Sequence, residues 1–360
     1  MKNHFLKSTK LVFILTLALC TLSAFSQEKR VLFIGNSYTA VNNLPNIFQE
    51  VVESTGDTVF CKQNSPGGYR FQDHVYNSTT NRLLREGNWG YVVLQEQSQL
   101  PSFPIQQVQQ EVFPYARALD SLINHFNGPC VETVFYMTWG RKNGDQQNCP
   151  VWPPVCTYEG MDSLLNLRYM MMGYDNNAIV SPVGAVWKYI RTKHPEIELY
   201  SSDGSHPSPE GSYAAACTFY STIFRKDPAN ITYNFSLDEY TANKIKNAVK
   251  NVVYFNQQRW YIGKYDSIMQ INCDPHINIP KFQESKIQVF PNPATNIINI
   301  NLNQNAPNMP MYLYSNEGVL VKRTICNSST ATIDLSSLPK GVYILKLGDF
   351  NPIRKKIVKI

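Results

Sequence analysis

The sequence predicts an α/β fold, a three-layer arrangement of one parallel sheet between helices, followed by a small all-β sandwich. Short continuous apolar runs at 31–34 and 91–94 are typical of strands buried on both faces. They alternate with stretches of helical spacing, such as residues 45–54. Alternation of strand and helix favours a parallel sheet. From residue 288 onward, short β-rich runs separated by turn residues favour an antiparallel sandwich instead.

Length and composition indicate a globular protein of two or three domains. The chain has 360 residues, of which 43% are hydrophobic and 17% are charged. Its net charge of +6 is concentrated at the two ends, in the lysines of the first ten residues and in the basic segment 286–360. The middle of the chain is close to neutral. We therefore expect no nucleic acid among its partners, because a domain that binds nucleic acid presents a basic face.

The first 26 residues are typical of a secretory signal peptide. A lysine-containing start precedes the apolar run 11–19, and small residues at 24 and 26 form a cleavage site before Gln27. The alternative is a membrane anchor, but the run is shorter than the roughly 20 residues that span a bilayer. A lipid anchor at Cys20 is disfavoured by the bulky leucine before it. We expect an exported mature protein without a transmembrane segment.

Export changes the interpretation of the cysteines. The chain has eight, and removal of Cys20 leaves an odd number, so at least one is unpaired. Cys149 and Cys156 flank a short proline-rich loop, and we expect them to form a local disulfide in an oxidising compartment. Zinc is the alternative, but no C-x-x-C pair or histidine cluster supports a metal site. Cys217 lies in a run of small apolar residues that is typical of a buried free thiol.

The C-terminal segment 286–360 resembles the sorting domain of proteins exported by the type IX secretion system of Gram-negative bacteria. We place a linker at 263–285 before it. Four motifs in order carry the resemblance: 289–294 (VFPNPA), 314–318 (YSNEG), 338–343 (LPKGVY) and 355–359 (KKIVK). The resemblance implies a secretion machinery as partner and a secreted or cell-surface location. The alternative is an accessory carbohydrate-binding sandwich.

Polar clusters follow the predicted strands of the body, where parallel sheets place their sites. Ser37 comes just after the first strand, with Gly35 allowing a tight turn before it. Asp203 and His206 share one late loop. A serine nucleophile needs a base to take its proton and an acid to orient that base. These three residues would supply all three functions.

Two further clusters offer donors for a developing oxyanion. Gly67 and Gly68 follow the second strand, and a glycine N–H is a suitable donor. Gln95 and Gln97 follow the third strand, and either side-chain amide would serve. Each cluster alone is equally well explained as an ordinary loop or strand end.

Together, in this order, the four clusters resemble the SGNH (GDSL-type) hydrolases, which have a flavodoxin-like sheet. We place this catalytic domain at 27–262. The resemblance implies Ser37 as nucleophile, His206 as base, Asp203 as its orienting acid, and Ser37 and Gly68 (or Gly67) as backbone oxyanion donors. The cluster with Gln95 and Gln97 corresponds to the family's third sequence block, which has a Gly-x-Asn in other members. A glutamine would therefore take the place of the asparagine in this third block.

We therefore predict a serine esterase that needs no metal or organic cofactor and hydrolyses short-chain esters, acetyl esters above all, on small molecules or glycans. Tyr38, Tyr69, Trp139 and Arg141 are candidates to line the pocket, although aromatic rings at these positions fit core packing equally well. The alternative is a surface glycan-binding protein that kept the fold and lost turnover. The altered third block supports this alternative, and the intact serine, histidine and aspartate argue against it.

Overall fold

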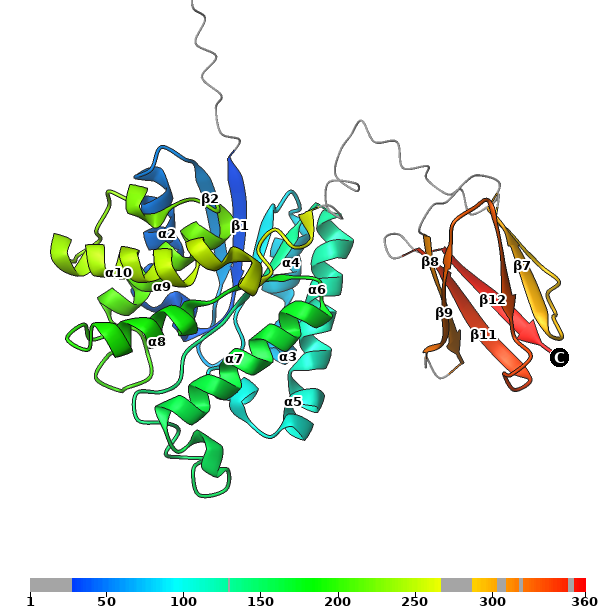
Figure 1. Cartoon of the computed structure of the whole chain (residues 1–360), viewed down its shortest axis with the longest axis horizontal. Coiled ribbons are helices and arrows are strands. Elements are labelled where there is room, and N and C mark those ends of the chain that lie inside the picture. Colours follow the sequence, from blue (N-terminus) through cyan, green and yellow to red (C-terminus); the bar gives the residue numbers. More distant parts are fainter. Residues whose placement is uncertain (1–27, 129, 267–286, 303–308, 317–319, 349–352) are drawn as a thin grey trace, which may run out of the picture.

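The computed structural model describes residues 28–128, 130–266, 287–302, 309–316, 320–348 and 353–360. The expected signal peptide and most of the expected linker lie outside these residues. The described residues up to 266 form an α/β body, and those from 287 form a separate β domain (Figure 1).

The body contains one parallel sheet of five strands in the order β2-β1-β3-β4-β5. This is the doubly wound, flavodoxin-like order, in which the carboxyl ends of all strands meet at one edge. The predicted fold class is therefore confirmed. The strands are β1 (Lys29–Ile34), β2 (Val59–Asn64), β3 (Tyr91–Leu94), β4 (Glu132–Tyr136) and β5 (Ile179–Ser181).

Helices cover both faces of the sheet (Figure 1). One face carries α2 (Leu44–Glu53), α8 (Val183–Lys193), α9 (Pro209–Ile223) and α10 (Glu239–Val252). The other carries α3 (Phe71–Tyr76), α4 (Ser78–Arg85), α5 (Ile105–Glu111), α6 (Phe113–Asn127) and α7 (Tyr158–Asp175). Short pieces complete the body: α1 (Ser37–Ala40), η1 (Val41–Asn43), η2 (Leu100–Ser102), η3 (Pro153–Val155), η4 (Pro228–Asn230) and η5 (Tyr254–Trp260). In the part of the chain that the structure describes, no helix is both long and apolar enough to cross a membrane.

Aromatic packing holds α2 and α9 on the first face. Phe33 of β1 meets Phe48 of α2 and Phe219 of α9 edge to face, with ring centroids 5.8 and 5.3 Å apart. All three rings are fully buried. Such contacts add to the hydrophobic gain of burying the rings. They fix the helix that follows β1 against the helix that follows the late loop.

The α/β body ends slightly later than the sequence suggested. The Arg225 guanidinium binds both carboxylate oxygens of Asp266, one of them at 2.8 Å. Arg225 also lies 3.6 Å from Glu132 at the start of β4. Residues 263–266 therefore pack on the body rather than belonging to the linker.

One disulfide closes the loop between β4 and α7. Cys149 and Cys156 are bonded, with Cα atoms 4.6 Å apart, as the proline-rich spacing predicted. Cys130 is also disulfide-bonded. Cys61, Cys217 and Cys326 are free, and Cys217 is fully buried as expected.

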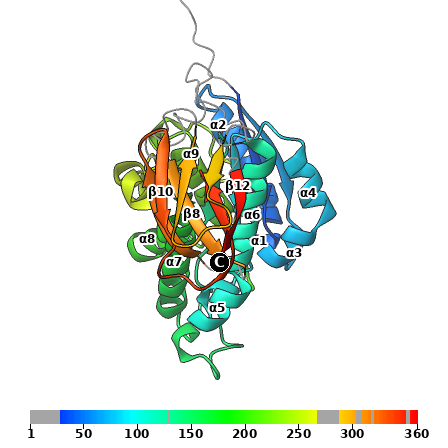
Figure 2. The ribbon, with the colours of Figure 1, turned by 90° about the vertical axis from the view of Figure 1, so that its right-hand side faces the viewer.

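The C-terminal domain is a small antiparallel sandwich. Its sheets have the orders β10-β7-β6 and β12-β11-β8-β9, and apolar residues of both sheets form one core. In the view of Figure 2 the axes of its labelled strands β8, β10 and β12 are roughly aligned. The strands are β6 (Gln288–Phe290), β7 (Ile297–Asn301), β8 (Met309–Ser315), β9 (Leu320–Cys326), β10 (Thr330–Asp334), β11 (Gly341–Leu347) and β12 (Ile353–Lys359). The predicted all-β domain is confirmed.

Candidate active site

Ser37 lies on the turn that follows β1, the strand between β2 and β3. The chain leaves the strand through Gly35 and begins α1 at Ser37, with Asn36 as its N-cap. A side chain at position 35 would not fit. A Cβ there would lie 2.5 Å from Thr39 Oγ1 and 2.6 Å from Gln95 Oε1. The close approach of these two side chains explains the glycine.

Three polar side chains meet at this turn in a continuous chain of hydrogen bonds. The Ser37 hydroxyl lies 2.9 Å from His206 Nε2. On the other side of the ring, His206 Nδ1 lies 2.5 Å from Asp203 Oδ2. The serine and histidine are 169 residues apart in sequence, and the fold brings them within hydrogen-bonding distance. This is the geometry in which a histidine can take a proton from a serine hydroxyl.

The hydrogen bonds around Asp203 favour its ionised form. Its Oδ1 accepts the backbone N–H groups of Ser205 and His206, both at 2.9 Å, while Oδ2 accepts the imidazole. Partial burial acts to raise the pKa of Asp203, but these hydrogen bonds together outweigh it and hold the pKa below its usual range. An ionised Asp203 keeps the proton of neutral His206 on Nδ1. Nε2 is then free to accept from Ser37.

The loop that carries Asp203 and His206 is secured at its end by α9. Ser208 is the N-cap of this helix and accepts the Gly211 N–H at 3.0 Å. The Ser208 hydroxyl donates to the Glu198 carbonyl at 2.8 Å. From the other side, the Asn42 amide donates to the carbonyls of Pro207 and Ser208. These contacts tie the loop to the segment just after Ser37.

Gln95 holds the turn of Ser37 through the oxygen of its side-chain amide. Oε1 accepts the Asn36 N–H at 2.9 Å and the Thr39 hydroxyl at 3.0 Å. A backbone N–H can only donate, so the atom facing Asn36 is the oxygen. The amide nitrogen donates to the Glu96 carbonyl. The side chain is fully buried, and its hydrogen bonds position the turn.

Gln97 and Glu96 are also engaged by the protein. Gln97 Oε1 accepts the N–H groups of Gln99 and Leu100, at 2.8 and 2.9 Å. The Glu96 carboxyl is completely buried and accepts the N–H groups of Phe71 and Gln97, at 3.0 and 2.6 Å. Burial raises the pKa of Glu96 to about 8, although these hydrogen bonds oppose it. Sequence reasoning missed this residue because nothing in the pattern marks a buried carboxyl.

The glycine loop after β2 is tied to the turn of Ser37 through its backbone. Gly67 and Gly68 are exposed, and Gly68 has a φ of +73°, a conformation that glycine adopts easily. The next residue, Tyr69, accepts a hydrogen bond from Asn36 Nδ2 on its carbonyl at 3.0 Å. The loop therefore lies beside the residue that precedes Ser37.

His74 is a structural residue behind the site. Its Nε2 donates to the Gly35 carbonyl at 2.8 Å, and its Nδ1 lies 2.9 Å from the Thr80 hydroxyl. Both ring nitrogens are thus occupied, and the side chain is fully buried. Burial lowers the pKa of His74, although its bond to Gly35 opposes the shift. The ring is therefore neutral near pH 7 and supports the turn from behind.

Tyr38 and Trp139 do not line an open pocket. Tyr38 is 2% exposed and Trp139 is fully buried. Their rings stack at a centroid distance of 4.8 Å, with 3° between the planes. Trp139 stacks in turn on Trp187 at 3.7 Å. The expectation that these two rings contact substrate is corrected, because the stack places them in the core beneath the loop of Asp203 and His206.

Arg141 and Tyr69 remain partly accessible. Arg141 lies 3.4 Å from the buried Asp145 and keeps 26% of its side chain exposed. The next residue, Lys142, donates its N–H to the Gly204 carbonyl at 2.8 Å, which places this segment against the loop of Asp203. Tyr69 is half-buried and contacts the edge of the His74 ring. Both candidates for substrate contact thus lie beside elements of the site.

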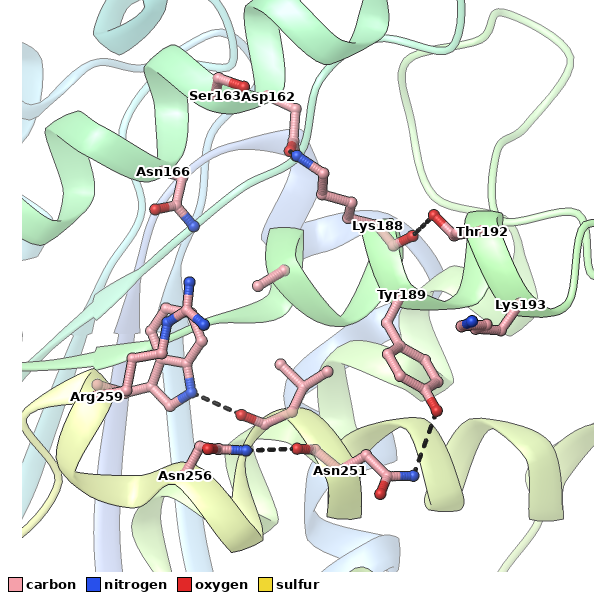
Figure 3. Close-up of a pocket in the computed structure, with 13 residues that line it drawn as sticks. Asp162, Ser163, Asn166, Lys188, Tyr189, Thr192, Lys193, Asn251, Asn256 and Arg259 are labelled. Carbon is pink, nitrogen blue, oxygen red and sulfur yellow. Dashed lines mark hydrogen bonds and ion pairs between the residues drawn. The ribbon is translucent and has the colours of Figure 1, made fainter.

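A separate hollow of about 530 Å³ lies between α7, α8 and the segment after α10 (Figure 3). Its lining mixes apolar and polar side chains, and the polar ones include Asn166, Lys188 and Arg259. Lys188 is paired with Asp162 at 3.2 Å. None of the residues that surround Ser37 lines this hollow. It is distinct from the arrangement of Ser37, Asp203 and His206.

Comparison with known proteins supports the interpretation of both domains. Residues 288–360 match the family model of the secretion system C-terminal sorting domain. The C-terminal domain is therefore a type IX sorting domain, as its four motifs implied. No curated protein matches the sequence.

Solved structures match the α/β body. A DUF4886 family protein from Bacteroides uniformis is 18% identical, with a TM-score of 0.54, over 62% of this chain and 94% of that one. A protein assigned to the SGNH hydrolases, from Slackia heliotrinireducens, is 24% identical, with a TM-score of 0.46, over 54% and 99%. The esterase EstA from Pseudoalteromonas sp. is 14% identical, with a TM-score of 0.41, over 55% and 97%. The likeness to the DUF4886 protein establishes a shared fold for the body.

The fit of Gly35 against Thr39 and Gln95 gives a first prediction. Gly35→Ala forces the turn of Ser37 to move, because two buried side-chain oxygens occupy the space of the new Cβ. We expect a loss of about 1–3 kcal/mol in the free energy of unfolding, measured in urea. Gly90→Ala is the control, since its Cβ would meet its nearest atom at 3.7 Å. Equal stability of the two variants would contradict the close packing of the turn.

The buried His74 gives a prediction about pH. Its folded-state pKa lies below the ordinary value of about 6.5, so the folded protein resists protonation there. Its contribution to stability is fully present above pH 6.5 and is lost as the pH falls through the folded-state pKa. Urea unfolding between pH 7.5 and 5 should therefore show a smaller loss of stability in His74→Gln than in the unmodified protein. The exposed His125, substituted in the same way, should leave the pH profile unchanged.

Proposed function

We propose that this protein is an exported serine esterase that removes short acyl groups, acetyl above all, from carbohydrates. The observation that carries the proposal is the chain of contacts from Ser37 through His206 to Asp203, at 2.9 and 2.5 Å. Each of the three residues has the chemistry that acyl transfer requires. The sorting domain supports action outside the cell, where polysaccharides are the abundant acylated polymers.

The proposed mechanism uses two acyl-transfer steps. His206 takes the proton of the Ser37 hydroxyl, whose oxygen attacks the ester carbonyl. The resulting oxyanion receives hydrogen bonds from the Ser37 N–H and from the exposed glycine loop, with Gly68 as the proposed donor. His206 then gives its proton to the departing alcohol, and water hydrolyses the acyl-enzyme by the same route. The ionised Asp203 stabilises the imidazolium in both steps.

The role of the third block is revised in this proposal. Gln95 offers its oxygen to the nucleophile turn, and Gln97 offers its oxygen to Gln99 and Leu100. Each amide group also donates one N–H within the protein. Each side-chain amide therefore has one remaining N–H that could donate to an oxyanion. We propose Gln97, which is half-buried, rather than the fully buried Gln95.

The alternative function is glycan binding without turnover. The engagement of both glutamines by the protein favours it, because a weaker oxyanion site would slow acyl transfer. Binding alone does not require Ser37, His206 and Asp203 to be aligned. The two functions are separated by whether hydrolysis depends on Ser37.

The test is hydrolysis of p-nitrophenyl acetate, butyrate and octanoate by the mature full chain. We expect the acetate to be preferred, and Ser37→Ala to lower kcat at least about a thousandfold. Asp203→Asn should also lower kcat severely, because it removes the charge that faces the imidazolium. Ser163→Ala, at an exposed serine of α7, is the matched control and should keep full activity.

Acetylated polysaccharides are the second substrate set, with acetate release as the readout. Release that is lost in Ser37→Ala would support the carbohydrate assignment. Hydrolysis that persists in Ser37→Ala would contradict the proposed nucleophile. A folded protein that binds these glycans and hydrolyses none of them would establish the alternative.

A further inference from the structure

Ser205 is held by contacts that the proposed reaction does not itself require. It lies between Asp203 and His206, and its N–H donates to Asp203 Oδ1. Its hydroxyl lies 2.7 Å from the Tyr38 hydroxyl, and its carbonyl accepts the indole N–H of Trp139 at 3.0 Å. Every polar group of this small residue is therefore engaged.

Tyr38 is the residue next to Ser37, and its hydroxyl reaches across to the loop that carries His206. The contact joins the two segments that must meet for proton transfer. We propose that the Tyr38–Ser205 hydrogen bond is a positioning contact that holds His206 at hydrogen-bonding distance from Ser37. The proposal rests on the proposed function, because it assigns Tyr38 and Ser205 to the same site.

The loop needs such a support because its reactive side chains are open to solvent. Asp203 is 48% exposed and His206 35% exposed at the side chain. Few apolar contacts fix groups as exposed as these. The neighbouring backbone bonds, Lys142 N–H to Gly204 and Ser201 N–H to the His206 carbonyl, hold the shape of the loop. They do not join it to the turn of Ser37.

Tyr38 is 2% exposed and its ring is closely packed, which makes it a suitable support. Its ring stacks on Trp139, and Trp139 stacks on Trp187. The Tyr38 ring also meets the His206 ring at 5.4 Å, at 70° between the planes. Burial raises the pKa of the Tyr38 hydroxyl, so the hydroxyl keeps its proton and the contact is unchanged across the neutral range. A fixed ring with a protonated hydroxyl sets the position of the loop above it.

The experiment compares Tyr38→Phe, Ser205→Ala and the double variant in the mature full chain. Each single variant removes the hydrogen bond between these two hydroxyls, and Tyr38→Phe also removes the contact of the Tyr38 hydroxyl with Ser98. With p-nitrophenyl acetate we expect kcat to fall roughly tenfold in both, which is the loss expected for one neutral hydrogen bond. KM should stay within about twofold. The double variant should be no worse than Tyr38→Phe, because that variant has already lost the bond to Ser205.

Tyr213→Phe is the matched control. Tyr213 is a buried tyrosine of α9 whose hydroxyl donates to the Tyr233 carbonyl at 2.7 Å. This variant loses an equivalent hydrogen bond that does not involve the loop of Asp203 and His206. Its free energy of unfolding should therefore fall, while its kcat should be unchanged. A loss of stability without loss of kcat in Tyr38→Phe would overturn the proposal. Additive losses in the double variant would also overturn it.

A second readout does not depend on activity and separates this proposal from the proposed function. The His206 Nδ1 proton should give a protected, strongly downfield proton resonance, identified by its absence in His206→Ala. We expect faster exchange and broadening in Tyr38→Phe and no change in Tyr213→Phe. If the protein shows this pattern but hydrolyses no ester, the result supports the positioning contact and contradicts the proposed esterase function. An unchanged resonance in Tyr38→Phe, or none in the unmodified protein, would overturn the contact.

Discussion

The Gln95 carbonyl oxygen accepts the Asn36 N–H and the Thr39 hydroxyl, and the geometry around Ser37 depends on these two bonds. They join the end of β3 to the turn after β1, two strands that are neighbours in the sheet. The side chains of Thr39 and Gln95 lie so close to Gly35 that position 35 has no room for a Cβ. The turn is therefore shaped by the sheet beside it, and its helix of four residues contributes little stability of its own.

The rear of the turn shows how the protein buries polar groups at low cost. His74 is neutral and satisfied at both nitrogens, by Gly35 and Thr80. Glu96 is buried and tends to keep its proton, since its pKa is raised to about 8. Neither residue carries a full charge at neutral pH inside the protein. Asp203 differs, because it is half-exposed and receives three hydrogen bonds, which stabilise its charged form.

Ser37 and His206 belong to segments of the α/β body that are 169 residues apart in the sequence. Phe48 of α2 and Phe219 of α9 pack against each other and against Phe33, which brings the start of α9 near the end of β1. The N-cap of α9, Ser208, follows His206 by two residues. The packing of these helices on one face of the sheet is thus what closes the distance between Ser37 and His206. The polar contacts at the loop then refine a position that apolar burial has already set.

The sequence by itself determined the fold class, the type IX sorting domain and the disulfide between Cys149 and Cys156. Each follows from local information: strand and helix periodicity, short motifs, or two cysteines a few residues apart. It also identified Ser37, Asp203 and His206 as candidate catalytic residues, because their motifs lie at a strand end and in one short loop. Only the tertiary structure decided the roles of Gln95, Tyr38 and Trp139. Whether an amide turns its oxygen or its nitrogen to a turn, and whether a ring is buried or open, depends on neighbours that are distant in the chain.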